Sequence, residues 1–241
     1  MAVFQKQFTI CYSHLDQFRR VKLTALLDFL QDVATAHSDS LGMTLENMKK
    51  DGAFWVLISL EATIHALPEI DEQITVETWS RGIRTVYGFR DFRILDSAGQ
   101  ILLTASSVWV YMGSKPLHPI RVPAEKATLF GATGEALLRR QPALPAPQSS
   151  IPAFSYTILR HDIDTNQHVN NVKYAEIALE SLPSFLWKSI PKHIELQFLH
   201  AAVLGMTLDV YTEASSLLAL CELRAHNTEN PCALVRFSFS E

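Results

Sequence analysis

Residues 159–183 read Leu-Arg-His-Asp-Ile-Asp-Thr-Asn-Gln-His-Val-Asn-Asn-Val-Lys-Tyr-Ala-Glu-Ile-Ala-Leu-Glu-Ser-Leu-Pro. The later part of this stretch carries apolar side chains at the spacing of one helix face, at Val172, Ala175, Ile177, Ala178, Leu179 and Leu182. Pro183 disrupts the pattern near its end, because proline lacks the N–H that a helix interior needs. Asp164, Asn166 and His168 stand at alternate positions before the helix. The stretch therefore predicts a polar loop that leads into an amphipathic helix.

The polar loop is a candidate catalytic site. It offers an acid, a carboxamide and an imidazole at a helix N-terminus, where free backbone N–H groups and the helix dipole favour developing negative charge. Hydrolysis of an ester or thioester develops such a charge on the carbonyl oxygen. Helix capping is the ordinary interpretation of any one of these residues. One cap needs only one acceptor side chain, so the trio together favours catalysis.

The order of predicted elements around this stretch occurs twice in the chain. The first half predicts a strand over 4–12, a helix over 23–37, and strands over 54–65, 73–82, 86–95 and 101–112. The second half predicts a strand over 154–159, a helix over 170–186, and strands over 194–202, 207–213, 218–226 and 233–240. A constant offset (164 − 16 = 148) relates Thr9-Ile10, Asp16, Val21 and Asp28 to Thr157-Ile158, Asp164, Val169 and Glu176. An internal duplication is the simplest explanation.

The expected fold class is α+β, with two repeats of strand, helix and four strands. One helix covers only one face of a five-stranded sheet, so two copies joined by their edges would form one wide antiparallel sheet around two long helices. The expected boundaries are 1–114 for the first repeat, 115–152 for a linker and 153–241 for the second repeat. Seven of the eleven prolines fall in the linker, which predicts no packed sheet there and at most a short helix near Ala132–Arg140.

Composition excludes several other classes of protein. The chain has 241 residues, 48% of them hydrophobic and 19% charged, with a net charge of −4, so no basic footprint for nucleic acid is present. No apolar run approaches the roughly 20 residues of a membrane span. The N-terminal residues lack an apolar signal core, which makes a cytoplasmic protein the expectation. The three cysteines, Cys11, Cys221 and Cys232, show no metal-binding spacing and are expected as reduced thiols. No metal and no cofactor is predicted.

Three segments carry a resemblance to a known family. The run from Asp164 to Tyr174 resembles the active-site segment of plant and bacterial acyl-acyl carrier protein (acyl-ACP) thioesterases. The runs Thr104-Ala-Ser-Ser-Val-Trp-Val110 and Glu77-Thr-Trp79 are similar to segments of that family's first half. The resemblance extends over nearly the whole chain and is weakest in the linker. It implies a double hotdog fold, in which a helix lies inside a curved sheet twice, and this agrees with the duplication.

The resemblance also implies an activity and a set of site residues. The activity is that of a thioester hydrolase, which releases free fatty acid from acyl-ACP and ends chain elongation, with the carrier protein as partner. Asp164, Asn166 and His168 match the family's catalytic Asp, Asn and His. Plant members carry Glu and then Cys on the strand after the second helix, where this chain has Leu199 and His200. Leu199 cannot ionise, so His200 is a possible auxiliary group, with an ordinary strand histidine as the alternative.

The trio suggests a mechanism in which water attacks the thioester directly. Either Asp164 or His168 would be the general base, and Asn166 would orient the water or the carbonyl. Backbone N–H groups of Val169 and Asn170 would stabilise the oxyanion. Glu176, the repeat partner of Asp28, is a second auxiliary candidate. The chain has no Gly-x-Ser-x-Gly elbow, and none of its cysteines is near the trio in sequence.

The first half lacks the trio and is expected to hold the acyl chain. It keeps Asp16 but has Phe18 and Arg20 where the second half has Asn166 and His168. Candidates for the apolar pocket lining are Phe29, Val33, Leu57, Ser59 and Trp79, with ordinary core packing as the alternative for each.

Two other functions remain open from the residues. One is an acyl-CoA thioesterase of the hotdog superfamily, and the other is a non-catalytic acyl-binding hotdog protein, in which the trio is expected to be broken. Both a monomer and a homodimer are compatible with two joined repeats.

Overall fold

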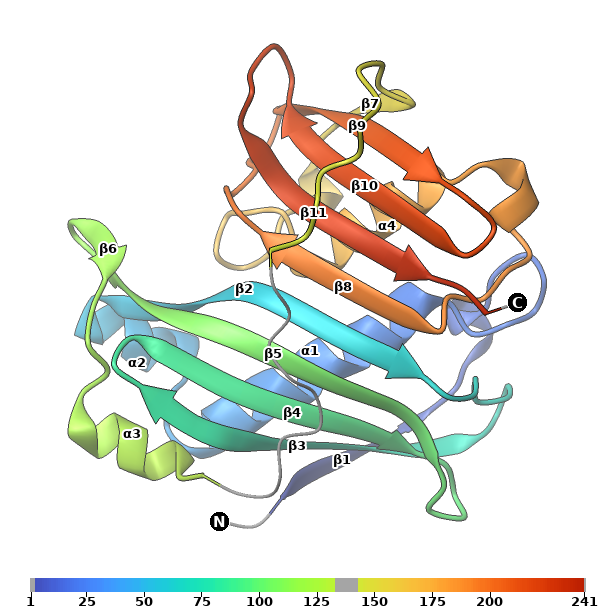
Figure 1. Ribbon diagram of the computed structural model, residues 1–241. Coiled ribbons are helices and arrows are strands. Elements are labelled where there is room, and N and C mark those ends of the chain that lie inside the picture. Colours follow the sequence, from blue (N-terminus) through green and yellow to red (C-terminus); the bar gives the residue numbers. More distant parts are fainter. Residues whose placement is uncertain (1–2, 133–142, 241) are drawn as a thin grey trace. The chain divides into compact units, whose positions relative to one another are not determined.

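The computed structural model describes residues 3–132 and 143–240 and divides into two compact units, Met1–Arg139 and Arg140–Glu241 (Figure 1). Most of the short helix expected near Ala132–Arg140 lies outside the described residues. No described helix combines the length and the apolar character that crossing a membrane demands.

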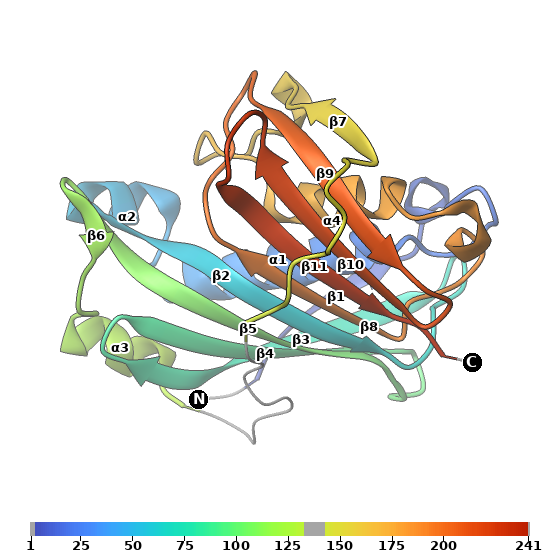
Figure 2. The ribbon, with the colours of Figure 1, turned by 45° about the horizontal axis from the view of Figure 1, so that its top comes forward.

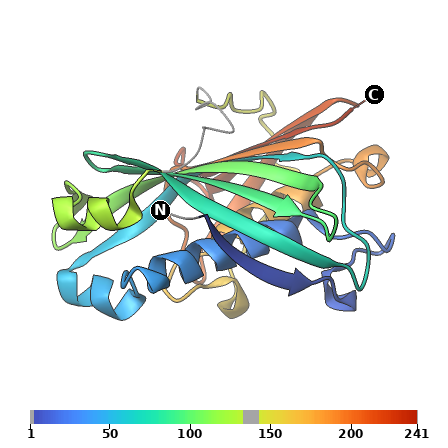
Figure 3. The same ribbon diagram turned by 90° about the horizontal axis from the view of Figure 1, so that it is seen from below.

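The first unit is an antiparallel sheet with one long helix along a face. Its strands run in the order β1 (Phe4–Thr9), β3 (Gln73–Arg84), β4 (Tyr87–Leu95), β5 (Ile101–Ser114) and β2 (Ala53–Ile64). The short β6 (Leu117–Pro119) pairs with β5. The helix α1 (Leu23–Ser40) lies along one face of this sheet (Figure 3) and contacts β1 and β3. This is the predicted strand–helix–four-strand order.

The sequence explains the buried face of α1 and both ends of the next helix. The apolar face of α1 is buried, and it includes Leu26, Leu30 and Val33 at helical spacing. The short α2 (Leu45–Asp51) begins at Thr44, whose hydroxyl accepts a hydrogen bond from Asn47 N at 3.2 Å. It ends at Gly52, which adopts φ +63°, a conformation that favours glycine.

Strand pairing assigns each side chain to one of two faces of the first sheet. We call the face toward α1 the inner face and the opposite one the outer face. Arg90 on β4 contacts α1, and Thr78 on β3 bonds Arg90, so both are on the inner face. Their sequence neighbours Asp91 and Trp79 pair with each other across β3 and β4, and alternation places them on the outer face.

Part of the predicted linker belongs to the core of the first unit. The helix α3 (Ala124–Phe130) follows β6, and its last residue, Phe130, is buried. Phe130 and Val122 join one hydrophobic cluster with Met43, Ala53 and Tyr111. Residues up to Phe130 therefore pack on the sheet, although their prolines exclude them from its central strands.

The second unit has the same construction. Its strands run in the order β7 (Phe154–Thr157), β9 (Thr207–Ala214), β10 (Leu218–Ala225), β11 (Pro231–Ser238) and β8 (His193–Phe198). The helix α4 (Asn171–Glu180) contacts β10 and β11 (Figure 2). The predicted helix over 170–186 is therefore two elements, α4 and a 3-10 turn at Ser184–Leu186, with Pro183 between them.

The duplication is visible in equivalent hydrogen bonds as well as in strand order. In each unit the first strand forms one edge of the sheet. The backbone amide just after that strand donates to a carbonyl just before the strand that pairs with it. Ile10 N donates to Glu72 O at 2.9 Å, and Ile158 N donates to Met206 O at 2.8 Å. Both units thus deliver the chain to the helix through the same kind of loop.

Candidate active site

The trio lies in a closed loop between two short elements of the second unit. A 3-10 turn at Arg160–Asp162 precedes the loop, and an isolated antiparallel bridge pairs Ile163 with Val169. Asp164 N donates to His168 O at 2.8 Å, and Gln167 N donates to Asp164 O at 3.1 Å. Gln167 adopts φ +66°, which lets the chain reverse. The alternating positions therefore form a tight turn.

The Asp164 carboxylate holds this turn together. Its Oδ1 accepts from Asn166 N at 2.8 Å and from His168 N at 3.3 Å, and its Oδ2 accepts from Asn166 Nδ2 at 3.4 Å. The side chains of Asn166 and His168 are exposed, while Asp164 is half-buried. The structure thus brings the three predicted residues together, with Asp164 as the anchor and the imidazole presented to solvent.

The predicted oxyanion donors need correction. Val169 N donates to Ala202 O at 3.0 Å, and Asn170 N donates to Asp162 O at 2.9 Å. Both amides serve to attach the loop to its neighbours, so neither is a free donor in this structure. Asn170 is instead the N-cap of α4, and its Oδ1 accepts from Val172 N at 2.9 Å.

Two buried groups that the sequence analysis did not single out support the loop. The Asp162 side chain is fully buried, and its Oδ2 accepts from Tyr156 Oη at 3.0 Å and from Leu159 N at 2.8 Å. The Tyr174 hydroxyl accepts from Ala202 N at 3.0 Å. Burial raises the pKa of Tyr174 to about 12, so this phenol stays protonated at neutral pH. The repeat itself was a signal for Asp162, because it occupies the position of His14, which accepts from Cys11 N in the first unit.

The two auxiliary candidates are engaged elsewhere. His200 is exposed, and its Nδ1 donates to Pro231 O at 2.8 Å, as expected for an ordinary strand-end histidine. Glu176 is exposed on α4 and forms an ion pair with Lys173 at 2.9 Å. Neither interaction joins these side chains to the trio.

Two of the cysteines are poor nucleophiles. Cys221 and Cys232 are buried, and burial raises the pKa of each thiol above its ordinary value. Cys11 is exposed and lies in the first unit. Cys221 and Cys232 are therefore poorly suited to form a covalent thioester intermediate, and direct attack by water stays a prediction.

The matching loop of the first unit is closed in the same way but carries an ion pair. The Asp16 carboxylate accepts from Phe18 N at 2.8 Å and Arg20 N at 2.9 Å, and Arg19 adopts φ +62°. The Arg20 guanidinium also binds it at 2.9 Å. Partial burial acts to raise the pKa of Asp16, but the hydrogen bonds from Arg20 and Phe18 outweigh it and lower that pKa. This loop holds an ion pair where the second unit presents an amide and an imidazole.

Two of the five pocket-lining candidates lie on α1, and the other three lie on strands of the first sheet, on both of its faces. Phe29 and Val33 are buried on α1, and the Phe29 ring lies 4.7 Å from that of Phe8. Leu57 pairs with Trp109 on the inner face. A bulge follows Leu57, so Ser59 pairs with Val108 and points to the outer face.

Trp79 also lies on the outer face, beneath the Arg93 guanidinium at 5.0 Å. Ser59 and Trp79 therefore face away from α1, and their place in the lining of an acyl pocket stays a prediction. Phe29, Val33 and Leu57 remain candidates.

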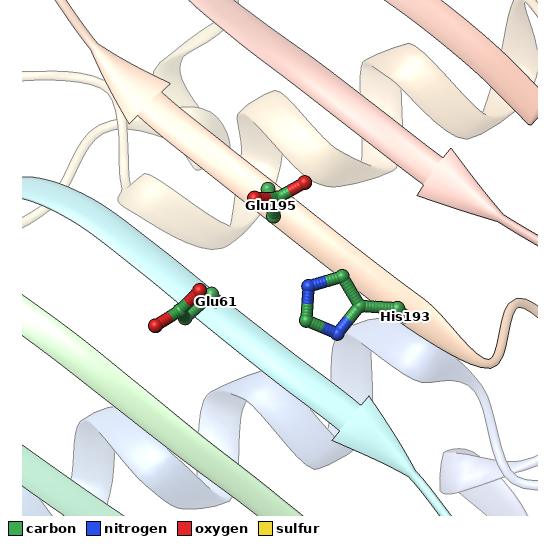
Figure 4. Close-up of side chains that lie close together, drawn as sticks. All are labelled: Glu61, His193 and Glu195. Carbon is green, nitrogen blue, oxygen red and sulfur yellow. The ribbon is translucent and has the colours of Figure 1, made fainter. Parts of the chain in front are cut away.

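Other titratable side chains are found on β8 and β2. His193 and Glu195 stand two positions apart on β8, and Glu61 is on β2 of the first unit (Figure 4). Glu195 is buried and forms an ion pair with Arg236 of β11. Burial lowers the pKa of His193. Because Arg236 already neutralises Glu195, this pair on β8 does not by itself favour a cation.

Comparisons with known proteins agree with this architecture. A model of the acyl-ACP thioesterase N-terminal domain matches residues 1–130, and a model of the C-terminal domain matches residues 148–235. The chloroplastic palmitoyl-acyl carrier protein thioesterase of Cuphea hookeriana is 30% identical over 201 residues, which cover 75% of this chain and 47% of that protein. The chloroplastic dodecanoyl-[acyl-carrier-protein] hydrolase of Cinnamomum camphora is 26% identical over 202 residues, covering 78% and 53%. The chain spans about half the length of these curated relatives.

Solved structures show the same fold over the full chain. An acyl-ACP thioesterase from Bacteroides thetaiotaomicron superposes with a TM-score of 0.91 and 21% identity, covering 99% of this chain and 98% of that one. The 12:0-ACP thioesterase from Umbellularia californica gives 0.88 and 21%, covering 99% and 97%. These likenesses show the double hotdog fold. Because the two domain models also match nearly the whole chain in the predicted order, the chain belongs to the acyl-ACP thioesterase family.

Proposed function

We propose that this protein hydrolyses the thioester between a fatty acyl chain and acyl carrier protein and releases the free fatty acid. The observation that carries the proposal is the closed loop in which Asp164 holds Asn166 and exposes His168. Family membership supports the same chemistry, and several curated relatives are named as acyl-ACP thioesterases or hydrolases.

The loop favours His168 as the general base. The Asp164 carboxylate accepts hydrogen bonds from two amides of the turn through Oδ1, so it serves to hold the loop together. The imidazole is exposed and belongs to the side-chain type that exchanges protons near neutral pH. His168 would take a proton from water as the water oxygen attacks the thioester carbon. It would return the proton to the departing thiolate when the carbon–sulfur bond breaks.

Asn166 is the residue at the loop that fits the charge developing on the carbonyl oxygen. Its Nδ2 has only a long contact of 3.4 Å with Asp164, which leaves its second N–H for the substrate. The amides of Val169 and Asn170 are engaged, so an exposed carboxamide is the better-placed donor. Preorganised donors of this kind contribute about 3 kcal/mol of transition-state stabilisation each.

The experiment is a free-thiol assay of the purified protein against a panel of saturated and unsaturated acyl-ACPs, with the same acyl chains on CoA as a second arm. Release of thiol from acyl-ACP that depends on His168 is the expected result. A matched control is His118→Ala, because His118 is an exposed histidine of the first unit whose Nδ1 bonds only its own turn, at Pro116 O. Faster turnover of acyl-CoA than of acyl-ACP would assign the protein to a CoA thioesterase instead, and no thiol release from either would refute the proposal.

A further inference from the structure

The first unit contains a buried arginine that the proposed mechanism does not use. Arg90 on β4 is only 6% exposed and points from the inner face toward α1. Its Nη1 lies 2.8 Å from His37 Nδ1 and donates to Thr78 Oγ1 at 3.0 Å. The guanidinium also lies over the Phe130 ring, 5.9 Å from its centroid. The Arg90 guanidinium therefore contacts side chains of three elements, α1, β3 and α3.

The immediate partners of Arg90 do not neutralise its charge. Thr78 is uncharged, and burial together with the Arg90 charge lowers the pKa of His37 to about 4, so His37 is neutral at pH 7. Burial lowers the pKa of Arg90 to about 10, which still leaves it protonated. A buried charge without a counter-charge is costly in a protein interior.

The nearest carboxylate in sequence is committed to the other face of the sheet. Asp91 follows Arg90 directly, and alternation turns its side chain to the outer face. There it forms an ion pair with Arg81 at 2.9 Å and accepts from Ser106 Oγ at 2.6 Å. Within residues 3–132 and 143–240, no ion pair joins Arg90 to an acidic side chain.

The remaining donors of Arg90 have the geometry that binds a carboxylate. Both of its hydrogen bonds use Nη1, so the edge formed by Nε and Nη2 donates to no acceptor in the part of the chain that the structure describes. Those two N–H groups form a parallel fork that matches the two oxygens of a carboxylate. Aromatic rings lie beside this site, because Phe4 stacks on His37 at 5.2 Å and Phe130 meets His37 edge-on at 6.3 Å. The cross-strand neighbours of Arg90 are the buried serines Ser80 and Ser107.

We propose that Arg90, Thr78 and His37 form a buried site in the first unit that binds the carboxylate of an aliphatic acid. One carboxylate matches the single positive charge, and an aliphatic chain can pack against the rings of Phe4 and Phe130. A phosphate dianion would leave excess negative charge in this interior, because Arg93, the next cation along β4, points to the outer face. The carboxylate has two possible sources, a free fatty acid or the far end of a dicarboxylic acyl chain. Only the supply of these ligands rests on the proposed function.

Calorimetric titration of the full chain with decanoate, and with decanol as the uncharged analogue, tests the site. Decanoate is expected to bind at least about tenfold more tightly, as a charge-assisted fork implies. Arg90→Met should abolish the preference, and Arg90→Lys should reduce it because lysine keeps the charge but not the fork. The matched control is Arg93→Met, which removes an arginine from the same strand but from the outer face and should keep the preference.

Equal binding of acid and alcohol by the wild type, or no binding of either, would overturn the proposal. An unchanged preference for decanoate in folded Arg90→Met would also overturn it. The same holds if Arg93→Met loses as much of the preference as Arg90→Met does. If Arg90→Met does not fold, the wild-type comparison and Arg90→Lys decide the matter.

Turnover of decanedioyl-ACP against decanoyl-ACP separates the two sources. A relative gain for the diacid chain that Arg90→Lys removes assigns the site to a substrate end. Selective binding of free decanoate without that gain assigns it to the fatty acid itself. Because the titrations involve no hydrolysis, an inactive protein that still prefers decanoate would refute the proposed function alone, whereas an active enzyme without this preference would refute only the carboxylate site.

Discussion

The replacement of His168 by alanine is the sharpest test of the candidate active site. The contacts of His168 with the loop run through its backbone, because its N–H donates to Asp164 Oδ1 and its carbonyl accepts from Asp164 N. Alanine keeps both. The side chain is exposed, so the free energy of unfolding should change by no more than about 0.5 kcal/mol. The fold and the loop should therefore survive while the imidazole is lost.

The catalytic loss should be large by comparison. Removal of a general base lowers the rate by a factor of roughly 10² or more. A hundredfold loss corresponds to about 2.7 kcal/mol of transition-state stabilisation. The assay is thiol release from acyl-ACP across a range of pH, with folding checked by circular dichroism. The kcat/KM of the folded variant should be lower than that of the wild type by this factor.

Asp164→Asn serves as the companion variant. An asparagine oxygen can still accept from the amides of Asn166 and His168, but without the negative charge that strengthens those bonds. Activity should again fall by roughly 10² as the loop loosens around the imidazole. Near wild-type turnover in folded His168→Ala would refute the reasoning, and the same result in both variants would remove the loop from the mechanism.

Three further predictions concern thiols, chain length and acid stability. A variant that lacks all three cysteines should retain most activity, and a trapped acyl adduct on any of these thiols would show covalent catalysis instead. Val33→Phe, on α1, should shift the product profile of a mixed acyl-ACP pool toward shorter chains, at a cost of about 1–3 kcal/mol in stability from overpacking. The control Ser59→Phe, on the outer face, should leave the profile unchanged. Equal shifts in the two variants would contradict the assignment of faces. Burial acts to raise the pKa of Asp209, but hydrogen bonds from Ser155 at 2.6 Å and His226 at 2.8 Å outweigh it and hold that pKa below the ordinary value of an aspartate. The stability from this carboxylate is thus present above its unfolded pKa and lost on acidification through its folded pKa, so urea titrations below about pH 4 should show a smaller further loss for Asp209→Asn than for the wild type.

The alternation and helical spacing of apolar residues were enough to predict the order of strands and helices in both halves. These patterns are local, because each residue's preference for a face depends on neighbours two to four positions away. The constant offset between Asp16 and Asp164 was enough to predict the duplication, and both residues indeed close equivalent loops. The helix over 170–186 was predicted too long because tertiary packing, beyond Pro183, continues the chain as a 3-10 turn.

The faces on which the pocket-lining candidates lie could not be predicted from alternation alone. A single bulge after Leu57 reverses the faces of the residues that follow, so Ser59 points away from α1. Trp79 has a large, mainly apolar side chain, and the sequence alone does not show which face of the sheet it lies on. It is buried on the outer face, where Arg93 lies over its ring. A buried side chain can lie on either face of the sheet, so burial alone does not show which face it occupies.

The sequence by itself determined the elements and their duplication, and it singled out the polar trio as a candidate site, because each of these is encoded in short stretches of chain. Only the tertiary structure decided which polar groups in those stretches are available. Val169 N is engaged by Ala202 O, and Arg90 meets His37 across 53 residues of sequence. The physical reason is that a hydrogen bond depends on distance and direction in space. A residue far away in the chain can therefore accept a hydrogen bond from a donor, and the sequence around that donor does not show this.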